Sequence, residues 1–531
     1  MARISIFNIG AAGIVRDIPP HLLPPEAWSD GQNVRFKDNK VQKFTGEALI
    51  FDPPTVPPYW ALAVQGPANV LWLYAGLTKI YTVDAGGTHF NITRQSVGTD
   101  VDYTGNAGDK WNGGLLGGIP VLTNGVDVPQ SWNPAATSQR LVDLPNWDAT
   151  KLAKYIVPFK SYLVALNITE SGTVKPHKVL WSHPADPGTV PMSWDITDPT
   201  KDAGDVELTD AQSGVIRDAL QLRDNLIIYN DNSIWGMQFV GGTFIFRFFK
   251  IFDQSGILAH NCVGLLPKKA QHFVATGDDL VVHDGQTMQS VVDKSWRRFI
   301  DAHINPDQLD NSFVVTNPLQ DEQWFCFPEV GSTLPSLAVV WNTKDNTVGA
   351  RDLSSTDFIA LGVLDVAQAT QTWDGSTSSW SGAGFPWDGR GFAPQSLGLL
   401  KLDSTNTQLL QMDTTNQLNG INMSSFIERQ GLALVGRDRQ NNPKTDMTKR
   451  KLLTRIWIEA EGGPFTVQAG AQEDLNANVV YDAGQTFTPG TDSYVDVTAN
   501  GRFLAVKFSS NTDVTWQLHS YDLEVSVMGE N

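Results

Sequence analysis

Short apolar runs, bounded by Gly, Asn, Asp and Pro, recur along the whole chain. Runs rich in Val, Ile, Leu, Phe, Tyr and Trp between turn residues are typical of β-strands. In residues 226–238 (LIIYNDNSIWGMQ), for example, two such runs flank an Asn-Asp-Asn turn, and these residue types tolerate a positive φ. Helical periodicity is scarce, and its best match, over 210–222, is weak. The chain is therefore predicted to be all-β.

The spacing of these runs indicates a repeated unit. An aromatic strand, a turn and an aliphatic strand return every ~40–50 residues between about 60 and 353, which is the spacing of four-stranded propeller blades. Trp-Asp pairs begin at Trp147, Trp194, Trp373 and Trp387, but their irregular gaps do not fit a WD40 array. We therefore expect a β-propeller body of roughly six blades over 46–370.

The segments outside this body differ in pattern. Residues 371–396 are rich in Gly, Ser and Trp, and we expect Trp373, Trp380 and Trp387 to anchor a loop there. Clear alternation late in the chain predicts a separate C-terminal β-sandwich. The expected divisions are a strand or arm that closes onto the propeller (1–45), the propeller (46–370), the Trp-rich loop (371–396), a closing hairpin (397–433), a basic connector (434–455) and an acidic sandwich (456–531).

Composition agrees with a folded β protein. Charged residues make up 18% of the chain, below the average of about 25%, while Trp and Phe are abundant. No apolar run approaches the ~20 residues of a membrane helix, and we expect neither a signal peptide nor membrane insertion. Cys262 and Cys326 fit no metal spacing and are interpreted as reduced core thiols.

Charge narrows the possible partners. The formal net charge of −18 excludes a general, sequence-independent DNA binder, because such proteins neutralise phosphates with Lys and Arg. The charge is also uneven: residues 434–455 carry +5, whereas 456–531 carry −9. This pattern favours an assembly contact at the basic stretch, and a solvated loop is the alternative. The candidate contact residues are Arg437, Arg439, Lys449, Arg450, Lys451 and Arg455.

Motifs for catalysis are missing. The sequence contains no P-loop, His-Glu-x-x-His, EF-hand loop, Cys-x-x-Cys or Gly-x-Ser-x-Gly. His260, His272 and His283 fall in one region, where core or turn histidines are favoured over a metal trio. We therefore predict no catalytic, cofactor-binding or metal-binding residues, and a protein that is not an enzyme.

Two stretches resemble a known family. Residues 14–46 contain a Pro-rich stretch, then Trp28–Ser29–Asp30 and Asn33–Val34–Arg35–Phe36, and they end on Lys-Phe-Thr-Gly. This order resembles the N-terminal segment of the tail nozzle proteins of short-tailed bacteriophages, also called tail tubular, hub or packaged-DNA stabilisation proteins. A more specific series is similar to the propeller core of that family, and it comprises 222–229, 233–235, 241–242, 246–248, 253–256, 259–262 and 282–286. The Trp-Asp-Gly units and 427–431 are similar to later family features, and 85–150 depart from the family.

The resemblance implies an assembly role. Family nozzles have a β-propeller body with added β domains and form a hexameric ring at the distal end of the tail, through which DNA leaves. The implied partners are five further copies, tail adaptor or head-to-tail connector proteins, and tail fibres or spikes. The implied location is the virion, after assembly in the host bacterial cytoplasm. An acidic lumen would let DNA pass without sequence-specific binding, because it repels phosphate.

Two alternatives and two expectations stay open. The first alternative is a tail adhesin or depolymerase that binds host glycans, based on sugar stacking at Trp373, Trp380 and Trp387. The second, an unrelated cytosolic β enzyme, has no motif in the sequence behind it. We expect Asn33, Arg35 and Phe36 to lie on a strand that ties the N-terminus to the body and closes the ring of blades. We also expect reversal of Arg450 and Lys451 to Glu to weaken assembly and to leave the fold of the monomer intact.

Overall fold

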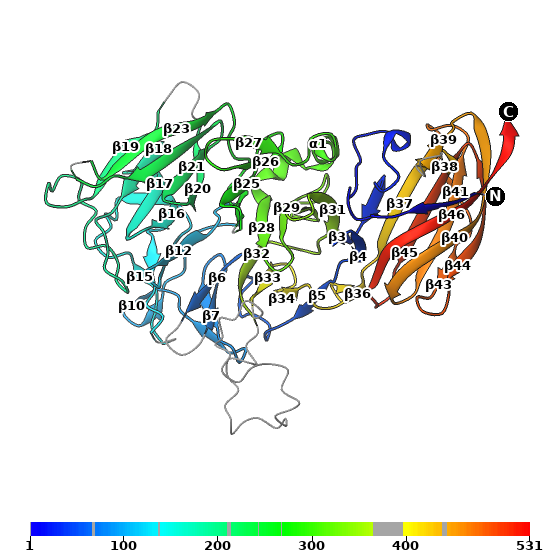
Figure 1. Cartoon of the computed structure of the whole chain (residues 1–531). Helices are drawn as coiled ribbons and strands as arrows, with labels where there is room; N and C mark the ends of the chain where they lie inside the picture. The colour runs from blue at the N-terminus through cyan, green and yellow to red at the C-terminus, as the bar shows by residue number, and fades with distance from the viewer. Residues whose placement is uncertain are drawn as a thin grey trace, which may run out of the picture.

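The computed structural model describes residues 2–65, 70–135, 138–209, 214–242, 244–266, 268–364, 397–437 and 443–530. These residues form two bodies that lie side by side, a β-propeller and a β-sandwich (Figure 1). The sheets of both bodies are antiparallel. The prediction of an all-β chain is confirmed. No helix among the described residues has the length and apolarity to cross a membrane.

Seven four-stranded sheets form the propeller within the described ranges. Blade 1 comprises β6 (Trp60–Gln65), β7 (Val70–Ala75), β8 (Ile80–Val83) and β9 (His89–Asn91); blade 2 comprises β12 (Asn112–Leu116), β13 (Ile119–Thr123), β14 (Gln130–Ser131) and β15 (Val142–Asp143); blade 3 comprises β16 (Lys151–Phe159), β17 (Tyr162–Glu170), β18 (Thr173–Trp181) and β19 (Gly204–Glu207); blade 4 comprises β20 (Ile216–Leu222), β21 (Asn225–Asn230), β22 (Ser233–Phe239) and β23 (Phe246–Asp253). Blade 5 comprises β24 (Val263–Leu266), β25 (Gln271–Ala275), β26 (Leu280–His283) and β27 (Met288–Ser290); blade 6 comprises β28 (Phe313–Asn317), β29 (Glu322–Phe327), β30 (Leu337–Asn342) and β31 (Thr347–Asp352); blade 7 comprises β32 (Phe358–Val363), β33 (Leu397–Asp403), β34 (Gln408–Met412) and β5 (Glu47–Leu49).

The propeller closes on itself through blade 7. The first strands of successive blades are neighbours around the ring, and β32 of blade 7 lies beside β6 of blade 1. Its outer strand, β5, comes from the other end of the body and pairs with β34, with Met412 opposite Glu47. The Lys401 ammonium pairs with the Glu47 carboxylate at 2.7 Å, and both side chains are buried. Seven blades, instead of the expected six or so, result because this last blade is assembled from two distant segments.

The sandwich consists of two six-stranded sheets. The first sheet contains β3 (Val34–Lys37), β4 (Lys40–Lys43), β46 (Trp516–Glu530), β40 (Lys449–Gly462) and β44 (Tyr494–Gly501), with β1 (Ala2–Ile6) also paired to β46; the second contains β2 (Asp30–Gln32), β37 (Ser425–Leu432), β45 (Phe503–Ser510), β41 (Phe465–Gln472) and β42 (Val480–Tyr481), with β43 (Gln485–Phe487) also paired to β41.

Both ends of the chain therefore build the sandwich, and the propeller is inserted between β4 and β37. This differs from the expected divisions in three places. The arm expected over 1–45 supplies sandwich strands, and β5, which follows it, closes the propeller. The closing hairpin expected over 397–433 ends with β34, because β37 pairs with β45. The basic connector expected over 434–455 contains the start of β40. Strand pairing between chain ends leaves no local pattern in a sequence, which explains all three differences.

The remaining elements are short. They are the hairpins β10 (Gln95–Ser96) with β11 (Thr99–Asp100), β35 (Gln417–Leu418) with β36 (Ile421–Asn422) and β38 (Leu434–Arg437) with β39 (Pro443–Thr445), the helix α1 (Arg297–His303), and the 3-10 turns η1 (Pro20–Leu22) and η2 (Pro306–Asn311).

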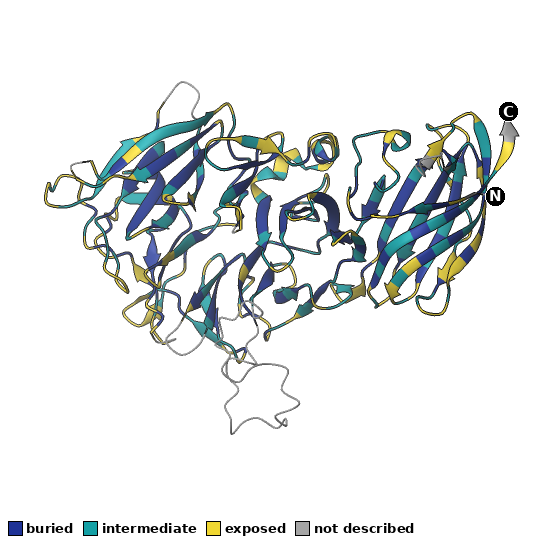
Figure 2. Cartoon of the chain, in the orientation of Figure 1, coloured by how far each residue is buried: buried dark blue, intermediate teal, exposed yellow. Residues whose placement is uncertain are grey.

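Burial follows the position of each strand (Figure 2). The middle strands β29 and β30 are buried at every residue, because neighbouring blades cover both faces of their sheet. In contrast, β44 alternates between exposed and buried residues, since one face of the sandwich sheet meets solvent.

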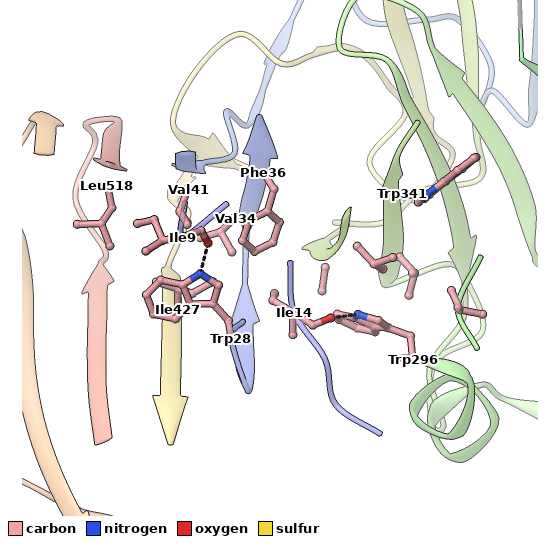
Figure 3. Close-up of a cluster of buried hydrophobic side chains, with 14 of the residues drawn as sticks. Ile9, Ile14, Trp28, Val34, Phe36, Val41, Trp296, Trp341, Ile427 and Leu518 are labelled. Carbon is pink, nitrogen blue, oxygen red and sulfur yellow. Dashed lines mark hydrogen bonds between the residues drawn. The ribbon is translucent and has the colours of Figure 1, made fainter. Parts of the chain in front are cut away.

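One apolar cluster continues from the sandwich into blades 4 to 6 (Figure 3). Two indoles fix it through buried hydrogen bonds: Trp28 donates to the Ile9 carbonyl at 2.6 Å, and Trp296 donates to the Ile14 carbonyl at 2.7 Å. The two bodies therefore share a core.

Candidate functional site

The N-terminal segment, residues 14–46, forms the contact between the propeller and the sandwich, which we call the joint. Its backbone bonds to β31, the outer strand of blade 6: the Ile14 amide donates to the Val348 carbonyl at 3.0 Å and the Asn33 amide to the Ala350 carbonyl at 2.9 Å. Gly13 has a φ of +68°, and a Cβ there would lie 2.9 Å from the Val348 nitrogen, so both the backbone conformation and the close approach favour glycine.

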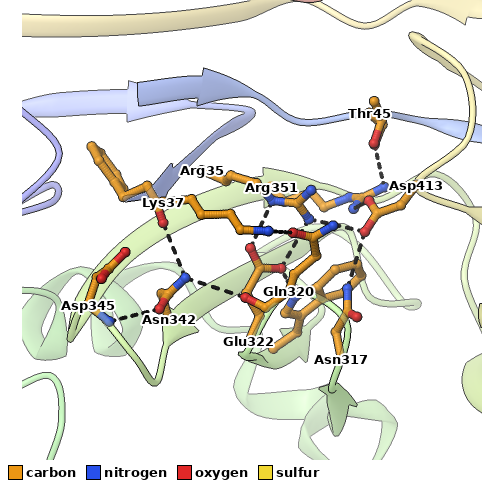
Figure 4. A network of polar contacts seen from close by, with 12 residues as sticks. Arg35, Lys37, Thr45, Asn317, Gln320, Glu322, Asn342, Asp345, Arg351 and Asp413 are labelled. Atoms are coloured by element: carbon orange, nitrogen blue, oxygen red, sulfur yellow. Dashed lines mark hydrogen bonds and ion pairs between the residues drawn. The ribbon is translucent and has the colours of Figure 1, made fainter. Parts of the chain in front are cut away.

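Three buried charges and one largely buried charge meet at this joint (Figure 4). The Arg35 guanidinium, from sandwich strand β3, donates to both oxygens of Glu322 on β29, at 2.8 and 3.1 Å. It also donates to Asp413, which follows β34, at 3.1 Å. Arg351 on β31 donates to the other oxygen of Asp413 at 2.6 Å and to the Thr45 carbonyl at 2.9 Å. Two cations and two carboxylates thus connect the sandwich to blades 6 and 7.

The pairing decides the charge states of this network. Burial lowers the pKa of Arg35, but Glu322 and Asp413 outweigh that effect and raise it, so the guanidinium stays charged. Burial raises the pKa of Glu322, although Arg35 opposes the rise. Burial would also raise the pKa of Asp413, but Arg35 and Arg351 together hold it below its usual value. Because each carboxylate is fixed by direct hydrogen bonds, the network holds parts of the fold together and offers no free acid or base.

Aromatic rings complete the joint. The Arg35 guanidinium lies 4.5 Å from the centre of the Phe44 ring, and that of Arg351 lies 4.6 Å from the Trp324 ring. The Trp324 indole donates to Glu322 at 2.9 Å. The strand expected at Asn33, Arg35 and Phe36 therefore does tie the N-terminus to the body, although it does not close the propeller.

Two small cavities lie just before the first strands of several blades. Lys110, His260 and Asp310, which precede the first strands of blades 2, 5 and 6, line cavities of about 180 and 30 Å³, and Asp357 lines the smaller one. A DNA duplex, whose major groove alone is about 12 Å wide, does not fit.

Two of the three candidate histidines meet in the core between blades 4 and 5. The Tyr229 hydroxyl lies 2.6 Å from His272 Nδ1 and 2.8 Å from His283 Nε2. His272 Nε2 lies 3.1 Å from the Gln221 carbonyl, and the Gly285 amide donates to His283 Nδ1 at 3.3 Å. These partners assign the protons: His272 Nε2–H donates to the carbonyl, and Tyr229 donates to His272 and accepts from His283. Burial lowers the pKa of His272 to about 4 and that of His283 to about 3, so both are neutral.

His260 lies apart from this pair and stacks on Tyr155, with ring centres 4.6 Å apart. Among the described residues, no group of three or more His, Cys, Asp or Glu could hold a metal ion. Cys262 and Cys326 are buried and free, and burial raises the pKa of both thiols.

The basic stretch does not form one surface. Lys451 is fully buried and donates to the carbonyls of Lys449 and Arg502, and burial lowers its pKa to about 8. Arg450 pairs with Glu473 at 2.6 Å. The expectation that reversing Arg450 and Lys451 together spares the fold is therefore wrong for Lys451, because a buried Glu would replace a satisfied ammonium.

The remaining candidate residues are only partly described by the structure. Arg455, further along β40, lies on the outer face of the first sandwich sheet and pairs with Asp496 at 2.7 Å. Arg439 and the side chain of Arg437 lie outside the described residues, as do Trp373, Trp380 and Trp387. Sequence reasoning missed the Glu322, Arg351 and Asp413 parts of the joint, since isolated charges in apolar strands show no spacing motif.

Comparisons with known proteins bear on the fold alone. No family model and no curated protein matches the chain. A streptogramin B lyase structure is 9% identical over 69% of this chain and 97% of the lyase chain, with a TM-score of 0.38. The N-terminal domain of Nup159 is 11% identical over 70% of this chain and 94% of that domain, with a TM-score of 0.35. At these identities and TM-scores the likeness supports no inference about activity, and the propeller is established by its own strand pairing.

Proposed function

We propose that this chain is the subunit of the distal tail nozzle of a short-tailed bacteriophage, a structural protein that forms a hexameric ring and conducts DNA during ejection. The proposal starts from the sequence resemblance over residues 14–46 and 222–286. It assigns no enzymatic activity to the chain. Its partners are five further copies, the adaptor or connector proteins of the tail, and tail fibres or spikes, and its location is the virion after assembly in the host cytoplasm.

The observation that supports the proposal most is the joint built from residues 14–46. The same segment that resembles the nozzle family places Arg35 between Glu322 and Asp413 and bonds the sandwich to β31. These ion pairs favour one arrangement of the two bodies, because a rotation would separate Arg35 from the buried carboxylate of Glu322. A fixed geometry of this kind suits the subunit of a ring, and that is the support it lends to the proposal.

The cavities beside the first strands bear on the path of DNA. At about 30 and 180 Å³ neither admits a duplex, and we infer that DNA does not pass through a single subunit. In a nozzle, the channel must therefore lie between copies. The net charge of −18 supports a channel along which phosphate slides without binding.

The alternative of a glycan-binding adhesin or depolymerase has no comparable support. The indoles on which it rests, Trp373, Trp380 and Trp387, lie outside the described residues.

Copy number in purified particles tests the proposal. Quantitative mass spectrometry, calibrated against the capsid and portal proteins, is expected to give six copies per virion. A copy number in larger multiples of three, together with peripheral labelling in electron micrographs, would overturn the nozzle and favour the adhesin.

A further inference from the structure

The outer face of the first sandwich sheet carries an exposed ladder of arginine and aromatic side chains. Arg3 on β1 lies over the Trp457 ring, 4.5 Å from its centre, and pairs with Asp522 at 2.6 Å. Arg455 lies 4.1 Å from the Tyr494 ring centre, and the Trp457 and Tyr494 centres are 4.8 Å apart. Four neighbouring strands, β1, β46, β40 and β44, contribute to this ladder face.

The composition of the ladder face is that of a protein interface. Arg, Trp and Tyr are enriched at the centres of interfaces and dominate their binding energy. Sugar stacking is disfavoured here, because guanidinium groups already lie over the Trp457 and Tyr494 rings and a pyranose needs a bare ring face. Four carboxylates against two guanidinium groups leave the face acidic, and these carboxylates are Glu459, Asp496, Asp522 and Glu524.

The propeller carries a complementary surface. A pocket of about 480 Å³ lies at turns of blades 5 and 6, and Lys268, Lys269 and Lys344 stand on its rim. Lys268 pairs with Asp321, and its side chain is 75% exposed; Lys344 pairs with Asp38 at 2.7 Å. Arg35 neutralises the buried Glu322 at the pocket, and the three lysines outnumber the remaining carboxylate of the lining, Asp321, so the lining of this lysine pocket carries a net positive charge.

The ladder face and the lysine pocket belong to different bodies. In Figure 1, β40 and β44 lie in the sandwich at the right, whereas β28 and β29, beside the pocket, lie near the middle of the molecule. The joint holds the two bodies in one arrangement. Each copy therefore presents both surfaces at fixed positions that are separate from each other. An interface between two different surfaces of identical chains is heterologous, and such interfaces generate rings when the rotation closes.

We propose that the acidic ladder face of one copy docks on the lysine pocket of the next copy. This inference rests on the proposed nozzle ring and names its subunit contact. Complementary charge fixes the register of the contact. The arginine and aromatic side chains of the ladder contribute the rigid surface that is buried at its centre.

Charge reversal in matched pairs tests the contact. The face variant combines Glu459→Lys and Glu524→Lys, and the pocket variant combines Lys268→Glu and Lys344→Glu; all four side chains lie at exposed or half-buried positions. The control for the face variant, Asp186→Lys with Asp224→Lys, makes the same change of charge at exposed positions of blades 3 and 4. Circular dichroism and thermal unfolding establish that each full-length variant is folded.

The assay adds each purified chain to particles that lack it and counts the copies bound on the tail. Wild type and control are expected to fill six positions. Each reversed variant alone is expected to bind about tenfold more weakly or worse, because like charges then face each other. An equimolar mixture of face and pocket variants is expected to restore six copies, since every contact in an alternating ring is complementary again.

Three results would count against the proposals, and they are distinguishable. If wild type forms a ring and each variant alone does so equally well, the ladder–pocket contact is wrong and the nozzle stands. If wild type itself forms no ring on the tail axis, the proposed function fails. Loss with each variant and no recovery in the mixture would also reject a direct contact between these two surfaces.

Discussion

Replacing Arg35 with Met tests the joint most severely. The Arg35 and Glu322 side chains are only 7% and 2% exposed, so the pair belongs to the buried class of ion pairs. Removing one partner of such a pair leaves an uncompensated charge and costs about 3–5 kcal/mol, whereas an exposed pair contributes at most about 1 kcal/mol. We therefore expect Arg35→Met to lose about 3–5 kcal/mol of unfolding free energy at pH 7.

The pH dependence of this loss has a definite sign. Without Arg35, the folded state keeps a proton on Glu322, because burial already raises the pKa of that carboxyl. The unfolded state releases the proton above its pKa of about 4.3. The folded state then binds more protons, so the deficit of the variant relative to wild type grows as pH rises above that value, by up to about 1.4 kcal/mol per pH unit. It is smallest near pH 4.

A companion variant separates the charge from the packing. In Arg35→Met with Glu322→Met, no unpaired carboxylate remains at this position, and an apolar pair of similar volume is close to neutral. We expect the double variant to recover most of the loss. Urea unfolding followed by tryptophan fluorescence measures all forms at pH 4.5 and 7. A loss below about 1 kcal/mol for Arg35→Met, or a loss independent of pH, would refute this account of the joint.

Three further outcomes are expected. His272 and His283 stay neutral when folded, with pKa values of about 4 and 3, so the unfolded state gains protons first as pH falls below about 6.5. Stability is then lost between pH 6.5 and 3 by up to about 1.4 kcal/mol per pH unit for each histidine, and replacing both with Phe should flatten that slope in urea titrations. Lys451→Glu should abolish soluble expression, whereas Arg450→Glu, at a half-exposed pair, should change the melting temperature by a degree or two at most. Deleting residues 2–43 removes four sandwich strands but keeps β5, so limited proteolysis should leave a propeller fragment and degrade the sandwich.

Part of the fold was predictable because it is local. Hairpins such as β21–β22 join adjacent apolar runs across a turn of Asn and Asp, and their pairing follows from sequence neighbours alone. The repeat of such hairpins led to a propeller with an added sandwich. The seventh blade and several segment boundaries were not predicted, because they depend on remote pairing: Glu47 meets Met412, and Ile4 meets Leu523. Nothing in a linear pattern reports those partners.

The placement of the basic residues was not predictable for a related reason. The basic stretch suggested one surface, but strand geometry sends successive side chains to opposite faces. Lys451 therefore points into the sandwich while Arg455, after a register shift in β40, lies on the outer face. Conversely, the members of the Arg35 network lie in or beside apolar strands, where an isolated charged residue forms no recognisable motif. Strand parity and remote pairing decide these positions, and only the structure contains both.

The central claim is that a rigid propeller–sandwich unit forms the tail nozzle. The most direct test is electron cryo-microscopy of the tail in purified particles, with the chain fitted as one body. The account predicts sixfold density on the tail axis, a channel between subunits, and one orientation of the sandwich relative to the propeller. Density for this chain on peripheral appendages, or a ring in which the two bodies must be fitted in a different relative orientation, would contradict it.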